Sequence, residues 1–145
     1  MNKKQELIIL KRRDVQVNLR LELFVESIEK SVGFYRDILE FNAPKEIIHT
    51  YVPVKKGSVT LGLGEMKNLP ESHPLKVSNS SQQTGLGVEI VLEVEDINDI
   101  YNKVVEKGYS IQTKLTKRSW GLEDFRLIDP DGYYIRITSM ATIES

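Results

Sequence analysis

Two stretches of the chain alternate apolar and polar residues and then change to a helical spacing of apolar residues. The first, RLELFVESIEKSVGFYRDILEF, begins at Arg20, and the second, EIVLEVEDINDIYNKVVEKGY, begins at Glu89. Strict alternation predicts a half-buried strand, whereas apolar residues three or four positions apart predict an amphipathic helix. Ser27 and Asp96 separate the two patterns and are good N-cap residues. Each stretch therefore predicts a strand followed by a helix.

The two predicted helices each carry one apolar stripe, which is typical of a helix that covers a sheet. The stripe of the first helix contains Ile28, Val32, Tyr35 and Leu39. The stripe of the second contains Ile97, Ile100, Tyr101, Val104 and Val105. Gly108 follows the second helix and suits the left-handed conformation in which many helices end.

The chain is an internal repeat. Aligning residues 25–28 with residues 94–97 gives an offset of 69 positions. After the first helix come EIIHTYVPV, a Lys-Lys-Gly turn and SVTLGLG; after the second come SIQTKLTKR, WGLEDFRLI, an Asp-Pro-Asp-Gly turn and YYIRITS. Each half therefore predicts a β-α-β-β-β module. A helix covers one face of such a sheet, so the other face is covered by the twin module or left concave.

These patterns predict one α+β structural domain with five segments. The segments are an N-terminal arm (1–14), a first module (15–64), a polar loop (65–86), a second module (87–140) and a C-terminal tail (141–145). The polar loop is long for a structureless connection, so it is a linker, a lid or a partly ordered segment. We interpret Lys11, Arg12 and Arg13 of the arm as a solvated face.

Composition narrows the classes of function. The 145 residues include 20 Lys and Arg and 21 Asp and Glu, which argues against a nucleic-acid-binding protein. The chain has no cysteine, which excludes disulfides and thiolate metal sites and favours a cytoplasmic location. It also has no apolar run of about 18 residues, so we expect no membrane span.

Two motifs, FYRDILEF in the first helix and IDPDGYYIRI before the last strand, are arranged here as in a known family. Together with the tandem β-α-β-β-β pattern, they resemble the vicinal oxygen chelate superfamily, which includes glyoxalase I, the extradiol dioxygenases and the bleomycin-resistance proteins. The resemblance covers roughly residues 15–140, with Glu40 where the family usually has glycine. It implies that the two modules form a cup-shaped, partly open barrel of mixed sheet.

The resemblance also implies four metal-ligand positions, where metal-dependent members carry His, Gln or Glu. In this chain they are Arg20, Gly62, Glu89 and Arg136. Strand alternation independently places all four on the face turned away from the helix, which we call the cup face. The same alternation adds Glu22, Phe24, Thr60, Glu93 and Tyr134 to this face.

Of the four positions, Glu89 alone carries a metal-binding side chain, because arginine has no free lone pair and glycine has no side chain. We therefore predict that the metal has been lost and that the protein has no cofactor. The two histidines do not replace it. His49 falls in a predicted strand and His73 in the polar loop, away from the ligand positions.

Two interpretations of the cup charges stay open. Arg20, Glu89 and Arg136 form an ion triad that fills the cup, or an arginine with donors to spare binds an anionic or oxygen-rich ligand. Glu22 and Glu93 would reduce the positive bias of the triad. Trp120 lines the cup beside Phe24 and Tyr134, or it packs in the core or at a dimer contact.

We therefore expect a homodimeric protein that binds a small molecule in its cup without metal chemistry, similar to the bleomycin-resistance proteins. The first alternative is a metal-dependent lyase, isomerase or dioxygenase of the same superfamily, and the second is a dimeric scaffold with a filled cup. Asp129 and Asp131 are explained as turn residues. The sequence leaves open whether the modules pair within one chain or across a dimer.

Overall fold

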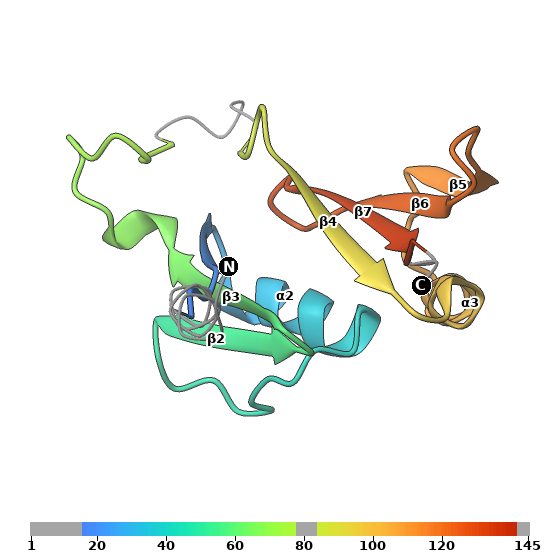
Figure 1. Ribbon diagram of the computed structural model, residues 1–145. Coiled ribbons are helices and arrows are strands. Elements are labelled where there is room, and N and C mark those ends of the chain that lie inside the picture. Colours follow the sequence, from blue (N-terminus) through green and yellow to red (C-terminus); the bar gives the residue numbers. More distant parts are fainter. Residues whose placement is uncertain (1–15, 78–83, 142–145) are drawn as a thin grey trace, which may run out of the picture.

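The protein folds as two sheets, each with a helix packed on one face, and is described by a computed structural model over residues 16–77 and 84–141. Figure 1 shows the two sheets as separate layers that do not close into a barrel. The α+β class and the two-module layout are therefore confirmed. The predicted N-terminal arm, part of the polar loop and most of the tail lie outside the described residues.

The first module contains a three-stranded sheet. Its elements are β1 (Arg20–Val25), α2 (Ile28–Gly33), the π-helical turn η1 (Phe34–Ile38), β2 (Tyr51–Lys56) and β3 (Val59–Glu65), and a short 3₁₀ turn η2 (Met66–Asn68) follows. The strand order is β1-β3-β2, with β1 parallel and β2 antiparallel to β3. Ser27 caps α2 by accepting a hydrogen bond from the Lys30 amide, as predicted.

This module has one strand fewer than the sequence predicts. The stretch between the first helix and β2 contributes one isolated bridge, between Asn42 and Lys55, and His49 lies before β2 rather than within a strand. Pro44 explains the difference, because it lacks an N–H group for a sheet ladder and restricts the residue before it. Pairing that begins at Asn42 therefore ends there.

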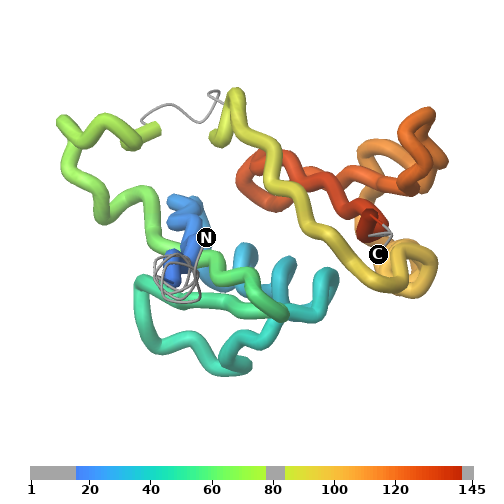
Figure 2. The backbone as a smooth tube through the Cα atoms, viewed as in Figure 1, coloured from blue at the N-terminus to red at the C-terminus, as the bar shows by residue number. Residues whose placement is uncertain are grey.

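The second module has the complete β-α-β-β-β pattern. Its elements are β4 (Glu89–Val94), α3 (Ile97–Glu106), β5 (Thr113–Lys117), β6 (Glu123–Ile128) and β7 (Tyr134–Ser139), in the order β4-β7-β6-β5. Asp96 caps α3 through the Asp99 amide, and Gly108 takes a φ of 75° after the helix. Figure 2 shows the described ends of the connection between the modules, green up to residue 77 and yellow from residue 84.

The predicted alternation holds within the strands. Leu61, Leu63, Ile135 and Ile137 are buried beneath the helices. The same alternation, continued one residue toward the N-terminus, predicts that Leu19 and Val88 face the helices, but both are exposed, because the sheets begin one residue later. Val105 was assigned to the apolar stripe of the second helix and is also half exposed, so that stripe is narrower than predicted.

The modules are held together by a cluster of hydrogen bonds that we call the seam, formed by Glu26, Tyr35, Asp129, Asp131 and Tyr133. Tyr35 donates from its hydroxyl to Asp129 Oδ2 at 2.8 Å, and the Glu26 amide donates to Asp131 Oδ1 at 2.7 Å. Tyr133 donates from its hydroxyl to the carbonyl of residue 24 at 2.9 Å. The two aspartates therefore do more than shape a turn, and no local pattern predicts these bonds between modules.

Burial is the largest cause of the raised pKa values of Tyr35, Asp129 and Asp131 in the seam. It raises the pKa of Tyr35 well above its usual value, and the neighbouring Asp129 charge raises it further. Burial also raises the pKa of Asp129, although hydrogen bonds from Tyr35 and nearby amides oppose the shift. The pKa of Asp131 rises to about 6 for the same reason. Asp131 of the seam therefore changes its protonation state in the mildly acidic range.

Candidate functional site

The cup face of the first sheet carries a small hydrogen-bonded cluster over Gly62. Arg20 Nε lies 2.8 Å from Glu22 Oε1, and the Tyr51 hydroxyl donates to the same oxygen at 2.9 Å. A Cβ at position 62 would collide with Glu22 Oε2 and with the Tyr51 hydroxyl. Gly62 therefore makes room for two side chains from neighbouring strands. Burial, followed by the hydrogen bond to Glu22, raises the pKa of Tyr51.

The cup face of the second sheet carries Arg136 at its centre. Arg136 lies opposite Val91 of β4 and opposite Arg126 of β6. Its Nε atom is 2.9 Å from Glu89 Oε1, which makes an ion pair, but the buried N–H has no aligned hydrogen-bond acceptor in the described structure. Two of the predicted residues, Glu89 and Arg136, are therefore in direct contact.

Arg126 and Asp124 extend this cluster and were missed by the sequence analysis. Asp124 is fully buried, and its Oδ1 atom accepts a hydrogen bond from Arg118 Nε at 2.9 Å. Arg126 Nε lies 3.9 Å from the same oxygen, and Arg126 Nη1 donates to the Tyr134 hydroxyl at 3.4 Å. Counting alternation back from the Asp-Pro-Asp-Gly turn through WGLEDFRLI would have placed both residues on the cup face.

We call Glu89, Arg118, Asp124, Arg126 and Arg136 the arginine cluster. Three guanidinium groups face two carboxylates, so its formal charge is +1. Like charges directly opposite each other on neighbouring strands are destabilising, and Arg126 and Arg136 have this arrangement. Three buried atoms of the cluster make no hydrogen bond with the described residues: Asp124 Oδ2, Arg126 Nε and Arg136 Nε. Such atoms are rare in folded proteins.

The other predicted residues fall into two groups. Tyr134 joins the arginine cluster through Arg126, whereas Phe24 and Thr60 belong to the first sheet and are half-buried. Glu93 is exposed on β4. Trp120 lies in the turn between β5 and β6 with 57% of its surface exposed, so it does not pack in the core of this chain.

The predicted triad is divided between the sheets. Arg20 pairs with Glu22 on the first sheet, and Arg136 pairs with Glu89 on the second. No ion pair joins Arg20 to Glu89 within residues 16–77 and 84–141. The Arg20 side chain is 61% exposed, so it is free to meet a further partner.

The described part of the chain contains no cluster of three His, Cys, Asp or Glu side chains that could hold a metal ion. His73 accepts a hydrogen bond from the Leu75 amide through Nδ1, and its ring lies 6.4 Å from that of Phe24. His49 is exposed before β2. In the same described ranges, no helix has the length and apolar character needed to cross a membrane.

The chain was compared with protein families, curated proteins and solved structures. A family model described as the Glyoxalase/Bleomycin resistance protein/Dioxygenase superfamily matches residues 18–137. None of the curated proteins matches the chain.

Several solved structures share the fold. An integron cassette protein from the mobile metagenome of V. cholerae has a TM-score of 0.65 and 20% identity, over 88% of this chain and 98% of that one. TioX from Micromonospora sp. ML1 has a TM-score of 0.67 and 16% identity, over 87% of this chain and 100% of that one. A glyoxalase/bleomycin resistance protein/dioxygenase from Nocardioides has a TM-score of 0.69 and 16% identity, over 98% and 96%. At these identities the likeness concerns the fold alone.

Proposed function

This chain belongs to the Glyoxalase/Bleomycin resistance protein/Dioxygenase superfamily, and from that premise we propose that it binds a small anionic or oxygen-rich molecule without metal chemistry. The binding site is the arginine cluster on the cup face of the second sheet. Arg126 and Arg136 supply the main contacts, and Glu89 and Tyr134 hold the two guanidinium groups in position.

One observation carries this proposal: two guanidinium groups lie opposite each other, and each has a buried Nε without a hydrogen bond in the described structure. A guanidinium fork matches the two oxygens of a carboxylate or phosphate. A bidentate anion that accepts from the other N–H groups of the two guanidiniums would reduce the repulsion between the arginines. The net charge of +1 on the cluster favours the same kind of ligand.

The residues at the family's metal positions do not fit a divalent metal. Arg20 and Arg136 have no lone pair to donate, Gly62 has no side chain, and Glu89 is already paired with Arg136. We therefore derive no step that requires a metal. The competing hypothesis, a metal-dependent lyase, isomerase or dioxygenase, predicts near-stoichiometric Zn, Mn, Fe or Ni in the purified protein, which Glu89→Gln would remove.

We further propose that a second copy of the chain completes the cup. Within the described residues, β1 and β4 each have a strand partner on one side only. Exposed apolar residues precede both strands, Leu19 before β1 and Val88 before β4. Unpaired edges of this kind favour pairing with another chain. A homodimer that places β1 of one copy beside β4 of the other would bring Arg20 toward Glu89.

A cytoplasmic location is in keeping with the absence of cysteine.

Calorimetric titration with citrate and with inorganic phosphate, in metal-free buffer, tests the binding proposal. We expect binding of at least one anion, weakened about tenfold or more in Arg126→Met and in Arg136→Met, because a charged hydrogen bond is lost. Arg36→Met is the matched control, since Arg36 pairs with the exposed Asp37 on the first helix. The proposal fails if neither anion binds, or if all three variants behave alike.

The mass of the protein in solution tests the proposal that a second copy completes the cup. Sedimentation should give a dimer for the unmodified protein, and Val88→Glu should shift it toward monomer by placing a charge beside the β4 edge. A monomer at all concentrations, with anion binding intact, would overturn the shared cup. A dimer in which no anion binds would instead favour the scaffold with a filled cup.

A further inference from the structure

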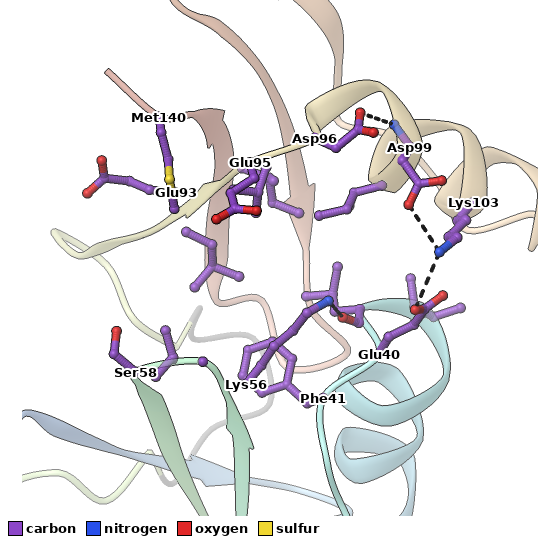
Figure 3. A pocket seen from close by; sticks show the side chains of 18 residues that line it. Glu40, Phe41, Lys56, Ser58, Glu93, Glu95, Asp96, Asp99, Lys103 and Met140 are labelled. Carbon is purple, nitrogen blue, oxygen red and sulfur yellow. Dashed lines mark hydrogen bonds and ion pairs between the residues drawn. The ribbon is translucent and has the colours of Figure 1, made fainter. Parts of the chain in front are cut away.

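A pocket of about 480 Å³ lies between the two modules, away from the arginine cluster. The first module lines it with the end of η1 and the β2–β3 turn; the second lines it with the end of β4, the first turns of α3 and the end of β7 (Figure 3). Ile137 belongs to the lining, whereas its neighbour Arg136 points to the opposite face of the sheet. The pocket and the arginine cluster are therefore separate sites.

Half of the residues that line the pocket are apolar. Nine of its 18 lining residues are aliphatic, aromatic or methionine, among them Phe41, Val59, Ile100 and Met140. The volume lies within the range of roughly 300–1,000 Å³ that is usual for small-molecule sites. An apolar ligand of modest size would therefore fit and would gain from leaving water.

The charges around the pocket are mainly negative. Glu40, Glu93, Glu95, Asp96 and Asp99 face two lysines, Lys56 and Lys103, so the formal charge of the lining is −3. Some of these groups already have partners. Lys103 lies 3.0 Å from Asp99 and 3.7 Å from Glu40, and Asp96 caps α3.

Glu95 differs from the other acidic residues of the lining. Figure 3 shows its carboxylate pointing into the space, whereas the carboxylate of Glu93 points away from it. Within the described ranges, no ion pair of 4.0 Å or less involves Glu95. Glu95 is an exposed residue, so the pocket combines apolar lining residues with an accessible carboxylate that has no ion-pair partner in the described ranges.

The second lysine of the lining, Lys56, makes no ion pair with this carboxylate within the described residues. Lys56 Nζ donates a 2.8 Å hydrogen bond to the Leu39 carbonyl, and burial lowers its pKa. Beside it, Glu40 has a φ of 59°, a left-handed backbone that non-glycine residues seldom adopt. Glu40 follows the C-cap of η1, where a left-handed residue commonly ends a helical segment.

From this geometry we propose that the pocket binds an apolar amine. The ammonium group pairs with Glu95, and the hydrocarbon or aromatic part packs against Phe41, Val59 and Ile100. A carboxylic acid of the same shape is excluded by the negative lining. The ligand thus has the opposite charge to the one proposed for the arginine cluster, and it bridges both modules.

Phenethylamine and 3-phenylpropionate form a matched pair of probes for this proposal. We expect phenethylamine to bind once per chain at millimolar concentration and to shift the methyl NMR signals of Val59 and Ile100, and 3-phenylpropionate to leave them unchanged. Glu95→Gln should weaken amine binding about tenfold, since it removes a charged contact. Glu93→Gln is the control, because its carboxylate points away, and should keep the original affinity.

The outcomes separate this site from the proposed function. Arg136→Met should leave phenethylamine binding unchanged, whether or not it abolishes anion binding. The proposal is overturned if the amine does not bind, if the acid binds as tightly, or if Glu95→Gln and Glu93→Gln have equal effects. Circular dichroism melting of each variant ensures that a loss of affinity is read only from folded protein.

Discussion

Tyr35 donates a hydrogen bond to Asp129, and this contact joins the two sequence motifs that identify the family. Tyr35 belongs to FYRDILEF in the first module, and Asp129 opens DPDG in the second. The bond is 2.8 Å long and buried, and Asp129 Oδ1 also accepts from the amides of Asp131 and Tyr133. The two motifs are thus the two halves of one contact between modules.

Removal of the Tyr35 hydroxyl should destabilise the folded protein. We expect Tyr35→Phe to lower the free energy of unfolding by about 1–3 kcal/mol, because a buried carboxylate oxygen loses its donor. Urea denaturation at neutral pH measures the change. Tyr101→Phe is the matched control, since Tyr101 packs edge-on against Phe125 and its hydroxyl makes no hydrogen bond with the described residues. It should change the free energy by less than about 0.5 kcal/mol.

The contribution of Asp131 to stability should decline as the pH rises through the weakly acidic range. The pKa of Asp131 is about 6 in the folded protein, above its value of about 4 in an unfolded chain. The folded state therefore holds a proton that the unfolded state releases. This contribution to stability is complete below about pH 4 and is lost as the pH passes about 6. Asp131→Asn, which stays neutral, should show a smaller decline in urea denaturation between these values.

Asp37 provides a control of opposite sign. The hydrogen bond from Arg36 lowers the pKa of Asp37, so its contribution is present above its unfolded pKa and is lost as the pH falls. Asp37→Asn should therefore leave the decline as steep or slightly steeper. If Asp131→Asn and Asp37→Asn give the same profile, the seam does not control the pH dependence.

A methyl group at position 62 should disrupt the cluster on the first sheet. In Gly62→Ala, the new Cβ would push Glu22 and Tyr51 apart. The pKa of Tyr51 should then fall toward its usual value of about 10, as followed by ultraviolet titration against Tyr51→Phe. In Gly64→Ala the nearest atom to the new Cβ is a ring carbon of Phe24 at 3.6 Å, an ordinary contact. A Tyr51 pKa that is unchanged in Gly62→Ala contradicts the prediction.

Glu40 allows the cost of its backbone conformation to be isolated. Glu40→Gly and Glu40→Ala both remove the ion pairs to Lys103 and Lys107, but only glycine is at ease at a φ of 59°. The glycine variant should be more stable than the alanine variant by about 1 kcal/mol in thermal or urea denaturation. Gly108→Ala, at a φ of 75°, should lose a similar amount. Equal stability of the two Glu40 variants would show that this residue is not strained.

Local patterns were sufficient for much of the fold. Alternation assigned Ile135 and Ile137 to the core and Arg136 to the cup face, because side chains of a strand point to opposite sides by geometry. The N-caps at Ser27 and Asp96 were also predicted from local residues, and both make the expected capping hydrogen bonds. Pro44 is an equally local signal, and pairing after the first helix stops at the bridge between Asn42 and Lys55 that precedes it.

Contacts between distant segments could not be predicted from local sequence patterns. Alternation assigned Arg20 and Glu89 to cup faces but could not tell that each would find its nearest partner on its own sheet. Arg126 meets Arg136 through the register of β6 and β7, which no single strand determines. The inter-module pocket depends on how two complete modules pack, so no pattern along the chain indicated it.

The bond between Tyr35 and Asp129 has no counterpart in the other half of the repeat. The offset of 69 positions that carries Val25 onto Val94 carries Tyr35 onto Val104, which has no hydroxyl to donate. The two halves are therefore no longer interchangeable copies. A chain assembled from two second halves would lack the donor, whereas a circular permutant that exchanged their order would retain it. The repeat therefore consists of two unequal parts, each of which supplies one partner of the contact.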